Sequence, residues 1–242
     1  MAQAPTADFL GQRKRWRIAP PTEGPGLGVT PLAAHLLRLR GIAMQDAVPI
    51  GVGAMAAILG LDDTAVEAAC RDAAQSEVVS AVNYNSPGQV VIAGHQGAVD
   101  RAIALCQEAG AKRALPLPVS VPSHCALMQP AAEQVAQAMA TMEFKLPRYA
   151  VYQNVNAQVP QTTEMLQQRL VEQLYRPVRW TECVNAMFDD GAGVFIECGP
   201  GKVLTGLNKR IQRQAKGLAV NDPDTLAAAL ELARDALDVQ EP

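Results

Sequence analysis

Between residues 53 and 119 the spacing of the apolar positions changes several times, which predicts two helices among four strands. Apolar runs at 53–59 (GAMAAIL), 78–83 (VVSAVN) and 89–94 (QVVIAG) are typical of buried strands. The Asn-Ser-Pro-Gly sequence at 85–88 predicts the turn between the second and the third. In KRALPLPV at 112–119 leucine and valine alternate with two prolines, so a fourth strand is expected at a sheet edge.

Helical spacing predicts the two helices between these strands. The first is expected at 64–75, where Thr64 and Glu67 have the spacing of a capping box. The second is expected at 97–110, with Gly110 at its end. Its apolar stripe consists of Val99, Ala102, Ile103 and Cys106. The resulting order, βαββαβ, predicts a ferredoxin-like unit at residues 53–119.

The chain on either side of this unit also alternates between helical and strand patterns. Helices are expected at 30–48, 130–142, 165–178, 180–193 and 223–237, and strands at 149–157 and 194–198. The glycines of ECGPGKVLTGL at 197–207 lack the spacing of a phosphate-binding loop and predict a tight strand-to-helix turn. These elements favour a larger α/β region with a parallel sheet, formed by 32–52 and 120–237 around the inserted unit.

Residues 1–31 do not continue these patterns. They contain five prolines and the basic run QRKRWR at 12–17, and no helical or strand period extends through them. We therefore expect an atypical, disordered segment. A basic run with Trp16 could contact a membrane or an anionic partner, but a solvated tail is the simpler interpretation.

The composition limits the location and the partners. A formal net charge of −3 and an aromatic content of 4% argue against a nucleic-acid-binding protein. The five cysteines have no C-x-x-C spacing and are expected to be reduced. Because the chain has neither an apolar run of the roughly 18 residues that span a membrane nor a secretory signal, we expect a cytoplasmic protein without membrane contact. A monomer without metal or cofactor is the simplest expectation.

The stretch LPVSVPSHCALM at 117–128 is a candidate for catalysis. It places His124 after the expected edge strand and before a helix, with Ser123 as a possible cap. A histidine in this setting is more often structural, but the positive end of a helix dipole would lower its pKa and favour a neutral base. Arg38 and Arg40, two residues apart on the first helix, are expected to face different ways.

Several long segments resemble, in order and in spacing, the malonyl-CoA:acyl carrier protein transacylases of bacterial fatty-acid synthesis. They are LRLRGIAMQDAVPIGVGAMAAILGLDD (37–63), VNYNSPGQVVIAGH (82–95), GAKRALPLPVSVPSHCALM (110–128), LYRPVRWTE (174–182) and ECGPGKVLTGLNKRI (197–211). The resemblance runs from about Leu32 to Ile211, and more loosely to Leu237. It implies an α/β-hydrolase-like large subdomain, incomplete at its N-terminal end, with the ferredoxin-like unit inserted.

The resemblance also implies a reaction, in which a serine takes malonyl from malonyl-CoA and passes it to the phosphopantetheine thiol of acyl carrier protein. His124 then corresponds to the general base, and Arg40 to the arginine that holds the malonyl carboxylate. The backbone carbonyl of Gln173 would orient the histidine, and Asn83 and Asn85 would line the cleft between the subdomains.

The nucleophile that the resemblance implies is not found. The family's serine lies in a G-H-S-L-G elbow before the arginine helix, but the corresponding residues 12–18 read QRKRWRI, and no serine precedes Ser76. Cys125 is adjacent to His124, and Ser86 and Ser123 lack an elbow, so none of them is expected to substitute. Three explanations of residues 1–31 stay open: a truncated or misread gene, a degenerate paralogue, and a fragment that pairs with a serine-carrying chain.

A non-catalytic alternative follows, in which the chain is a remnant that binds acyl carrier protein or coenzyme A. Acyl carrier proteins are acidic, so docking requires a basic surface. The candidates are Lys112, Arg113, Lys202, Lys209 and Arg210. Malonyl transfer would identify the enzyme, whereas salt-sensitive binding without turnover would identify the binder.

Overall fold

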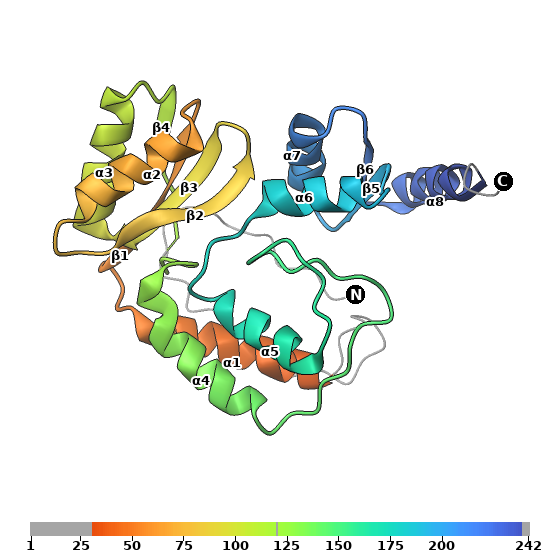
Figure 1. Ribbon diagram of the computed structural model, residues 1–242, viewed down its shortest axis with the longest axis horizontal. Coiled ribbons are helices and arrows are strands. Elements are labelled where there is room, and N and C mark those ends of the chain that lie inside the picture. Colours follow the sequence, from red (N-terminus) through yellow and green to blue (C-terminus); the bar gives the residue numbers. More distant parts are fainter. Residues whose placement is uncertain (1–30, 120, 239–242) are drawn as a thin grey trace, which may run out of the picture.

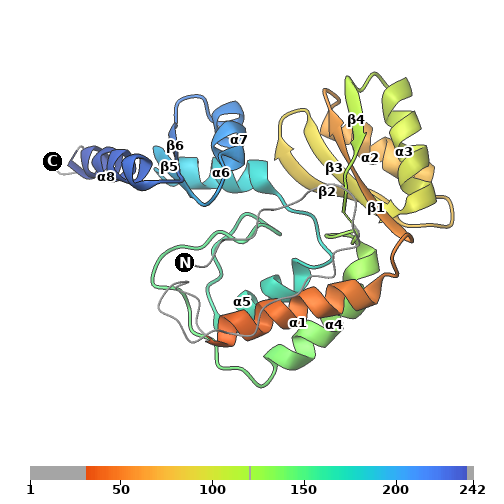
Figure 2. The same cartoon turned by 180° about the vertical axis from the view of Figure 1, so that it is seen from behind.

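The computed structural model describes residues 31–119 and 121–238, which form three regions (Figure 1). A four-stranded sheet with two helices lies on one side, three helices pack below it, and a C-terminal region extends away from both (Figure 2). The disordered segment predicted at 1–31 lies outside the described residues, except that residue 31 already belongs to the first helix.

The four-stranded sheet has the order β2-β3-β1-β4, and all its pairs are antiparallel. The strands are β1 (Gly53–Leu59), β2 (Val79–Ser86), β3 (Gln89–His95) and β4 (Arg113–Pro116). Helices α2 (Asp63–Ala74) and α3 (Gln96–Glu108) cover one face, so the chain follows the predicted βαββαβ order, with β4 at an edge. The predicted fold class is confirmed, while the boundaries at 53 and 119 stay a prediction.

Both faces of this sheet are buried by apolar side chains. The face toward α2 and α3 forms a core that includes Ile58, Val66, Ile92, Val99, Ala102 and Cys106. The opposite face carries Met55, Val82, Val91 and Ala93, which pack against Cys125. The second core therefore holds the segment after β4 against the sheet.

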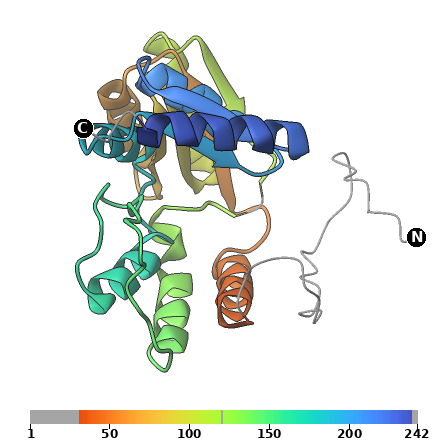
Figure 3. The ribbon, with the colours of Figure 1, turned by 90° about the vertical axis from the view of Figure 1, so that its right-hand side faces the viewer.

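The three packed helices are α1 (Pro31–Ala47), α4 (Gln129–Met139) and α5 (Thr163–Glu172), and a 3-10 turn (Ala126–Met128) leads into α4. Their shared core includes Ala43, Val48, Met128, Ala131, Val135 and Leu174. α4 lies between α1 and α5, as the view along the side of the molecule shows (Figure 3).

The C-terminal region consists of α6 (Trp180–Asp189), β5 (Val194–Cys198), α7 (Val203–Ile211), β6 (Lys216–Val220) and α8 (Pro223–Asp238). β5 and β6 pair in parallel across α7, with Val194 opposite Lys216. The expected parallel sheet is present with two strands among the described residues. The sequence pattern did not reveal β6, because its five residues, KGLAV, contain no long apolar run.

The strand predicted at 149–157 is wrong. Gln153 and Gln158 make only an isolated bridge around a turn, and Tyr149 is 75% exposed. No strand among residues 31–119 and 121–238 pairs with this segment along its length, so its backbone groups cannot join a sheet.

Two local predictions, for the cap of α2 and for the turn between β2 and β3, are also wrong. The cap of α2 is Asp62, whose Oδ1 accepts from Thr64 N at 2.9 Å, so Thr64 and Glu67 do not form a capping box. Asn85 and Ser86 belong to β2 and not to the turn. The hairpin closes over two residues, and the second, Gly88, has φ 71°, which glycine adopts without strain.

Candidate active site

His124 lies in a tight loop between β4 and the 3-10 turn before α4. Its φ angle is 67°, in the left-handed region that residues other than glycine rarely adopt. Two contacts hold this loop against the sheet. Pro122 packs so closely on Gly53 that a Cβ added there would lie 2.5 Å from the proline ring. Cys125, 1% exposed, is buried in the core beneath the sheet.

Two backbone carbonyls at the end of α5 bind His124. The His124 N–H donates to Leu174 O at 3.0 Å, and His124 Nδ1 lies 2.6 Å from Gln173 O. Because a carbonyl oxygen only accepts hydrogen bonds, Nδ1 carries the proton and Nε2 keeps its lone pair. α5 ends at Glu172, earlier than the predicted residue 178, and the next two carbonyls bond His124 instead of continuing the helix.

The pKa of His124 is lowered from its ordinary value of 6.5, chiefly because the ring is buried. The hydrogen bond with Gln173 O raises the pKa, and the positive charge of Arg40 lowers it. The direction agrees with the sequence prediction, and burial is its largest cause. The predicted cap is wrong: the next turn begins after Cys125, which makes no side-chain capping bond, so Ser123 does not cap it.

Arg40 projects from α1 and is half-buried, whereas Arg38 is exposed, as their spacing predicts. The Nε of Arg40 is buried and has no hydrogen-bond partner within the described part of the chain. Burial lowers the pKa of the guanidinium, but an arginine stays charged near neutral pH. A cavity of about 70 Å³ between α1, α4 and α5 is lined by Arg40, Gln173 and apolar side chains. The site therefore offers a cation with which an anionic group could form an ion pair.

Asn83 and Asn85 lie on β2, whose register with β3 shifts at two places around them. Both residues are half-buried, and neither side chain is hydrogen-bonded to another described residue. Backbone bonds join this strand to the segment after α5: Val178 N donates to Val82 O at 2.8 Å, and Tyr84 N donates to Val178 O at 2.9 Å. The two asparagines thus lie where the sheet meets the segment that follows Gln173.

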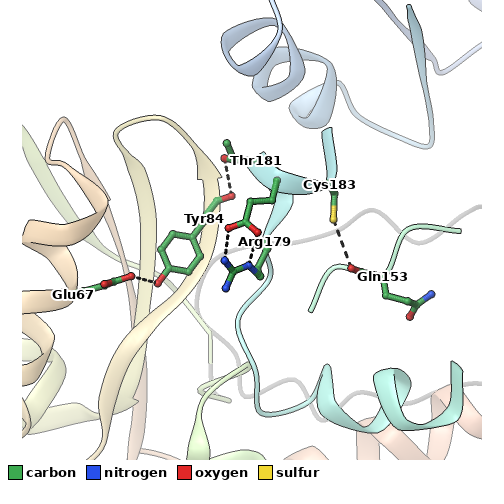
Figure 4. Close-up of polar contacts among 7 residues, drawn as sticks. Glu67, Tyr84, Gln153, Arg179, Thr181 and Cys183 are labelled. Carbon is green, nitrogen blue, oxygen red and sulfur yellow. Dashed lines mark hydrogen bonds and ion pairs between the residues drawn. The ribbon is translucent and has the colours of Figure 1, made fainter. Parts of the chain in front are cut away.

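Side chains reinforce this junction (Figure 4). Thr181 Oγ1 donates to Tyr84 O at 3.1 Å, and the Tyr84 hydroxyl donates to Glu67 Oε1 at 2.6 Å. Arg179 forms a two-point ion pair with Glu182 beside Tyr84. Glu67, predicted as part of a capping box, instead binds the sheet side of the junction.

One residue of the site was missed in the sequence. Gln173 Nε2 donates to Asn154 Oδ1 at 3.1 Å, so Asn154 contacts the residue whose carbonyl binds His124. Asn154 lies within 149–157, where the apolar pattern predicts a strand. The only signal in the sequence was a polar residue inside that apolar run.

No side chain among residues 31–119 and 121–238 is hydrogen-bonded to Nε2 of His124. Cys125 Sγ donates to Pro122 O at 3.2 Å, and burial raises the pKa of its thiol to about 11, so little thiolate forms at neutral pH. Ser86 Oγ is buried on β2 without a partner in the described chain. Residues 12–18, where the resemblance would place the nucleophile elbow, lie outside the described residues.

The candidate basic residues fall into two groups. Lys112 and Arg113 lie at the start of β4, and the other three lie at α7. In the α7 group, Arg210 Nη1 donates to Gln89 Oε1 at 2.8 Å. Lys209 lines a cavity of about 200 Å³ together with two further cations, Arg213 and Lys216. Positive charge therefore gathers at the C-terminal end of α7 and in the residues that follow it.

No group of three or more His, Cys, Asp or Glu residues within the described ranges is arranged to hold a metal ion. No helix in the same ranges is both long enough and apolar enough to cross a membrane. All five cysteines are unpaired, and Cys198 is the exposed one.

Comparison with known proteins identifies the family. The acyl transferase domain family matches residues 32–237. The malonyl CoA-acyl carrier protein transacylase of Escherichia coli K12 is 55% identical over 200 residues, which cover 83% of this chain and 65% of that protein. A crystal structure of an acyl carrier protein S-malonyltransferase from Vibrio cholerae has 58% identity and a TM-score of 0.81, over 82% of this chain and 65% of that one.

A malonyl-transacylase solved in complex with a type II PKS acyl-carrier protein has 53% identity and a TM-score of 0.81, over 83% of this chain and 65% of that one. The chain thus spans 65% of the length of these relatives. All the predicted site residues lie inside the matched range. The chain therefore belongs to the acyl transferase domain family.

Proposed function

We propose that this chain serves the transfer of a malonyl group from malonyl-CoA to the phosphopantetheine thiol of acyl carrier protein in fatty-acid biosynthesis. One observation carries the proposal: Gln173, whose carbonyl oxygen lies 2.6 Å from His124 Nδ1, lines the same cavity as the half-buried Arg40. The histidine can move a proton and the arginine can hold a carboxylate, and malonyl transfer needs both. The names of the relatives support the same reaction.

The first half of the proposed reaction needs a serine hydroxyl, for which residues 12–18 hold no counterpart. In that half, His124 Nε2 removes the hydroxyl proton of the serine while the serine oxygen attacks the thioester carbonyl. The carbon–sulfur bond breaks, and the imidazolium gives its proton to the departing sulfur of coenzyme A. In the second half, His124 takes the proton of the phosphopantetheine thiol, whose sulfur attacks the malonyl ester, and the proton returns to the nucleophile's oxygen. Each half begins with a neutral imidazole, the form that burial favours.

The other residues have supporting roles in this proposal. Arg40 donates two parallel hydrogen bonds to the malonyl carboxylate, which an acetyl group lacks. Gln173 orients His124 through its backbone carbonyl, and Asn83 and Asn85 line the cleft that receives the substrate. Malonyl-CoA enters as a substrate, and no cofactor takes part.

We also propose the place where acyl carrier protein docks. Lys202, Lys209 and Arg210 at α7 offer positive charge to an acidic partner. A relative solved with an acyl-carrier protein supports this class of partner. A monomeric, cytoplasmic protein is the corresponding expectation for the state in which the reaction occurs.

The test measures malonyl transfer to acyl carrier protein by intact mass, for the wild-type chain, His124→Ala and Arg40→Met. Transfer that depends on His124 would support the role of the base. Arg40→Met is expected to weaken malonyl-CoA binding by about 10- to 100-fold, from the loss of charged hydrogen bonds, and to leave acetyl-CoA binding unchanged. Equal affinity of the wild type for both thioesters would contradict the role of Arg40.

The alternative is a non-catalytic protein that binds acyl carrier protein or coenzyme A. It is favoured by one observation, that no described side chain is hydrogen-bonded to Nε2 of His124. Salt-sensitive binding of acyl carrier protein without any malonyl transfer would support this alternative and overturn the enzyme. The covalent state of the chain after exposure to malonyl-CoA, read from the same mass spectra, shows whether a nucleophile takes part.

A further inference from the structure

We propose that Asn154 is a positioning residue for His124 and that it acts through Gln173. This inference rests on the proposed function, because it concerns how the proposed base is held. Gln173 Nε2 donates to Asn154 Oδ1 at 3.1 Å, and Gln173 O accepts from His124 Nδ1 at 2.6 Å. The side chain and the backbone of one glutamine therefore connect the asparagine to the imidazole ring.

Helix geometry alone does not fix the carbonyl of Gln173. The residue is the C-cap of α5, with φ −58° and ψ −23°. Carbonyls at the end of a helix have no partner within it, and the last turn of a helix frays. The bond from the Gln173 side chain to Asn154 limits this motion, so that the carbonyl oxygen keeps facing His124.

Asn154 is a suitable anchor because hydrogen bonds hold both its own carbonyl and the backbone of the preceding residue, Gln153. Arg179 N donates to Asn154 O at 2.7 Å, and Gln153 N donates to Gln158 O at 2.9 Å. Figure 4 shows Gln153 beside α6, where Cys183 Sγ lies 3.8 Å from the Gln153 carbonyl oxygen. Movement of Asn154 would therefore break its own bond to the start of α6 and disturb the neighbouring contact of Gln153 with α6.

The same anchor connects the base to the sheet. Arg179 follows Val178, whose backbone N–H and C=O both pair with β2. A path of hydrogen bonds and adjacent residues thus leads from β2 through Asn154 and Gln173 to the ring of His124. In this arrangement Asn154 sets the orientation of the base without touching the substrate.

The test is 15N NMR of the histidine side chains in the full chain, which contains three histidines. The wild type is expected to show a protonated Nδ1 and an unprotonated Nε2 at His124, with well-separated shifts. Asn154→Ala is expected to bring the two shifts together, because a ring without a fixed acceptor samples both tautomers. Asn154→Asp keeps the acceptor oxygen and is expected to keep the shifts apart.

Asn156→Ala is the matched control, because it makes the same change in the same loop at a side chain that bonds Gln158 instead of Gln173. It is expected to leave the tautomer of His124 unchanged. Gln173→Ala removes the tether from the other side and keeps the backbone carbonyl. Its effect should equal that of Asn154→Ala, and the double variant should add nothing further.

A folded Asn154→Ala chain with the wild-type tautomer would overturn the proposal. An equal change in Asn156→Ala would also overturn it, since the loop as a whole would then be responsible. If Asn154→Ala does not fold, Gln173→Ala gives the same test with the asparagine intact. The readout does not depend on turnover, so a failure of malonyl transfer and a failure of this inference are distinguishable.

Discussion

Replacing Gly53 with alanine tests how firmly the loop of His124 is held against the sheet. An added Cβ would lie 2.5 Å from both Cδ and Cγ of Pro122. This is roughly 1 Å closer than the ~3.5–4.0 Å at which two carbon atoms attract each other. The proline ring is closed onto its own backbone and cannot rotate aside. Either β1 or the loop at 121–125 must therefore move.

The expected size of the effect combines two opposing terms. Overpacking of a tight contact costs about 1–3 kcal/mol. Alanine recovers about 0.5–1 kcal/mol relative to glycine in a strand, because it loses less backbone freedom on folding. Gly53 is not in the left-handed region, so backbone strain adds nothing. A net loss of up to about 2.5 kcal/mol in the free energy of unfolding follows, together with a longer distance from His124 Nδ1 to Gln173 O.

Urea unfolding measures the stability, and the tautomer of His124 measures the displacement of the loop. Gly206→Ala is the matched control, because a Cβ there has no neighbour within 4 Å. Gly206 lies inside α7, where alanine is expected to stabilise the chain by about 0.5–1 kcal/mol. The two substitutions thus have opposite expected signs. A Gly53→Ala chain with wild-type stability and an unchanged His124 signal would refute the rigid contact with Pro122.

Two further predictions concern pH and the junction between the sheet and α6. The free energy of unfolding is expected to decrease as the pH is lowered from about 7.5 to about 5.5. In this range the unfolded chain takes up a proton at His124 near the ordinary pKa of 6.5, whereas burial lowers the pKa of His124 in the folded chain. His124→Gln should remove that part of the loss in urea unfolding, and an unchanged pH dependence would contradict the assignment. Tyr84→Phe removes the donor to Glu67 and is expected to cost about 0.5–1.5 kcal/mol. Tyr152→Phe, which removes an exposed bond to Asp190, should cost less than about 0.5 kcal/mol, and equal losses would show that the junction adds nothing.

The ferredoxin-like unit could be predicted from the sequence because its signals are local. Each strand is an apolar run of a few residues, bounded by turn residues. Of the stripe predicted on α3, Val99, Ala102 and Cys106 are buried, and Ile103 is partly buried against the same core. Gly110 follows the helix with φ 97°, as a residue that ends a helix in the left-handed region does. In these cases local preference and tertiary packing favour the same structure.

The wrong predictions concern features that depend on distant partners. Residues 149–157 have the composition of a strand, but a strand forms only where a second strand can pair with it. Thr64 and Glu67 have the spacing of a capping box, but Asp62 caps the helix, and Glu67 accepts a hydrogen bond from Tyr84, 17 residues away. Asn154 could not be identified as a site residue, because its role depends on Gln173, 19 residues further along the chain.

The candidate base itself belongs to this second kind of feature. His124 and the Gln173 carbonyl that fixes its tautomer are 49 residues apart, and the ring is partly buried where its loop meets the end of α5. The neighbours of His124 in sequence supply neither the acceptor nor the cation that shifts its pKa. Gly53 packs against the loop of His124, Asn154 holds the Gln173 side chain, and the charge of Arg40 lowers the pKa of His124. Three separate contributions therefore set the position and the proton affinity of one ring. A substitution at Gly53, Asn154 or Arg40 is therefore expected to alter His124 although none of the three is the base itself. Whether the position, the tautomer or the pKa of His124 changes shows which of the three contributions was lost.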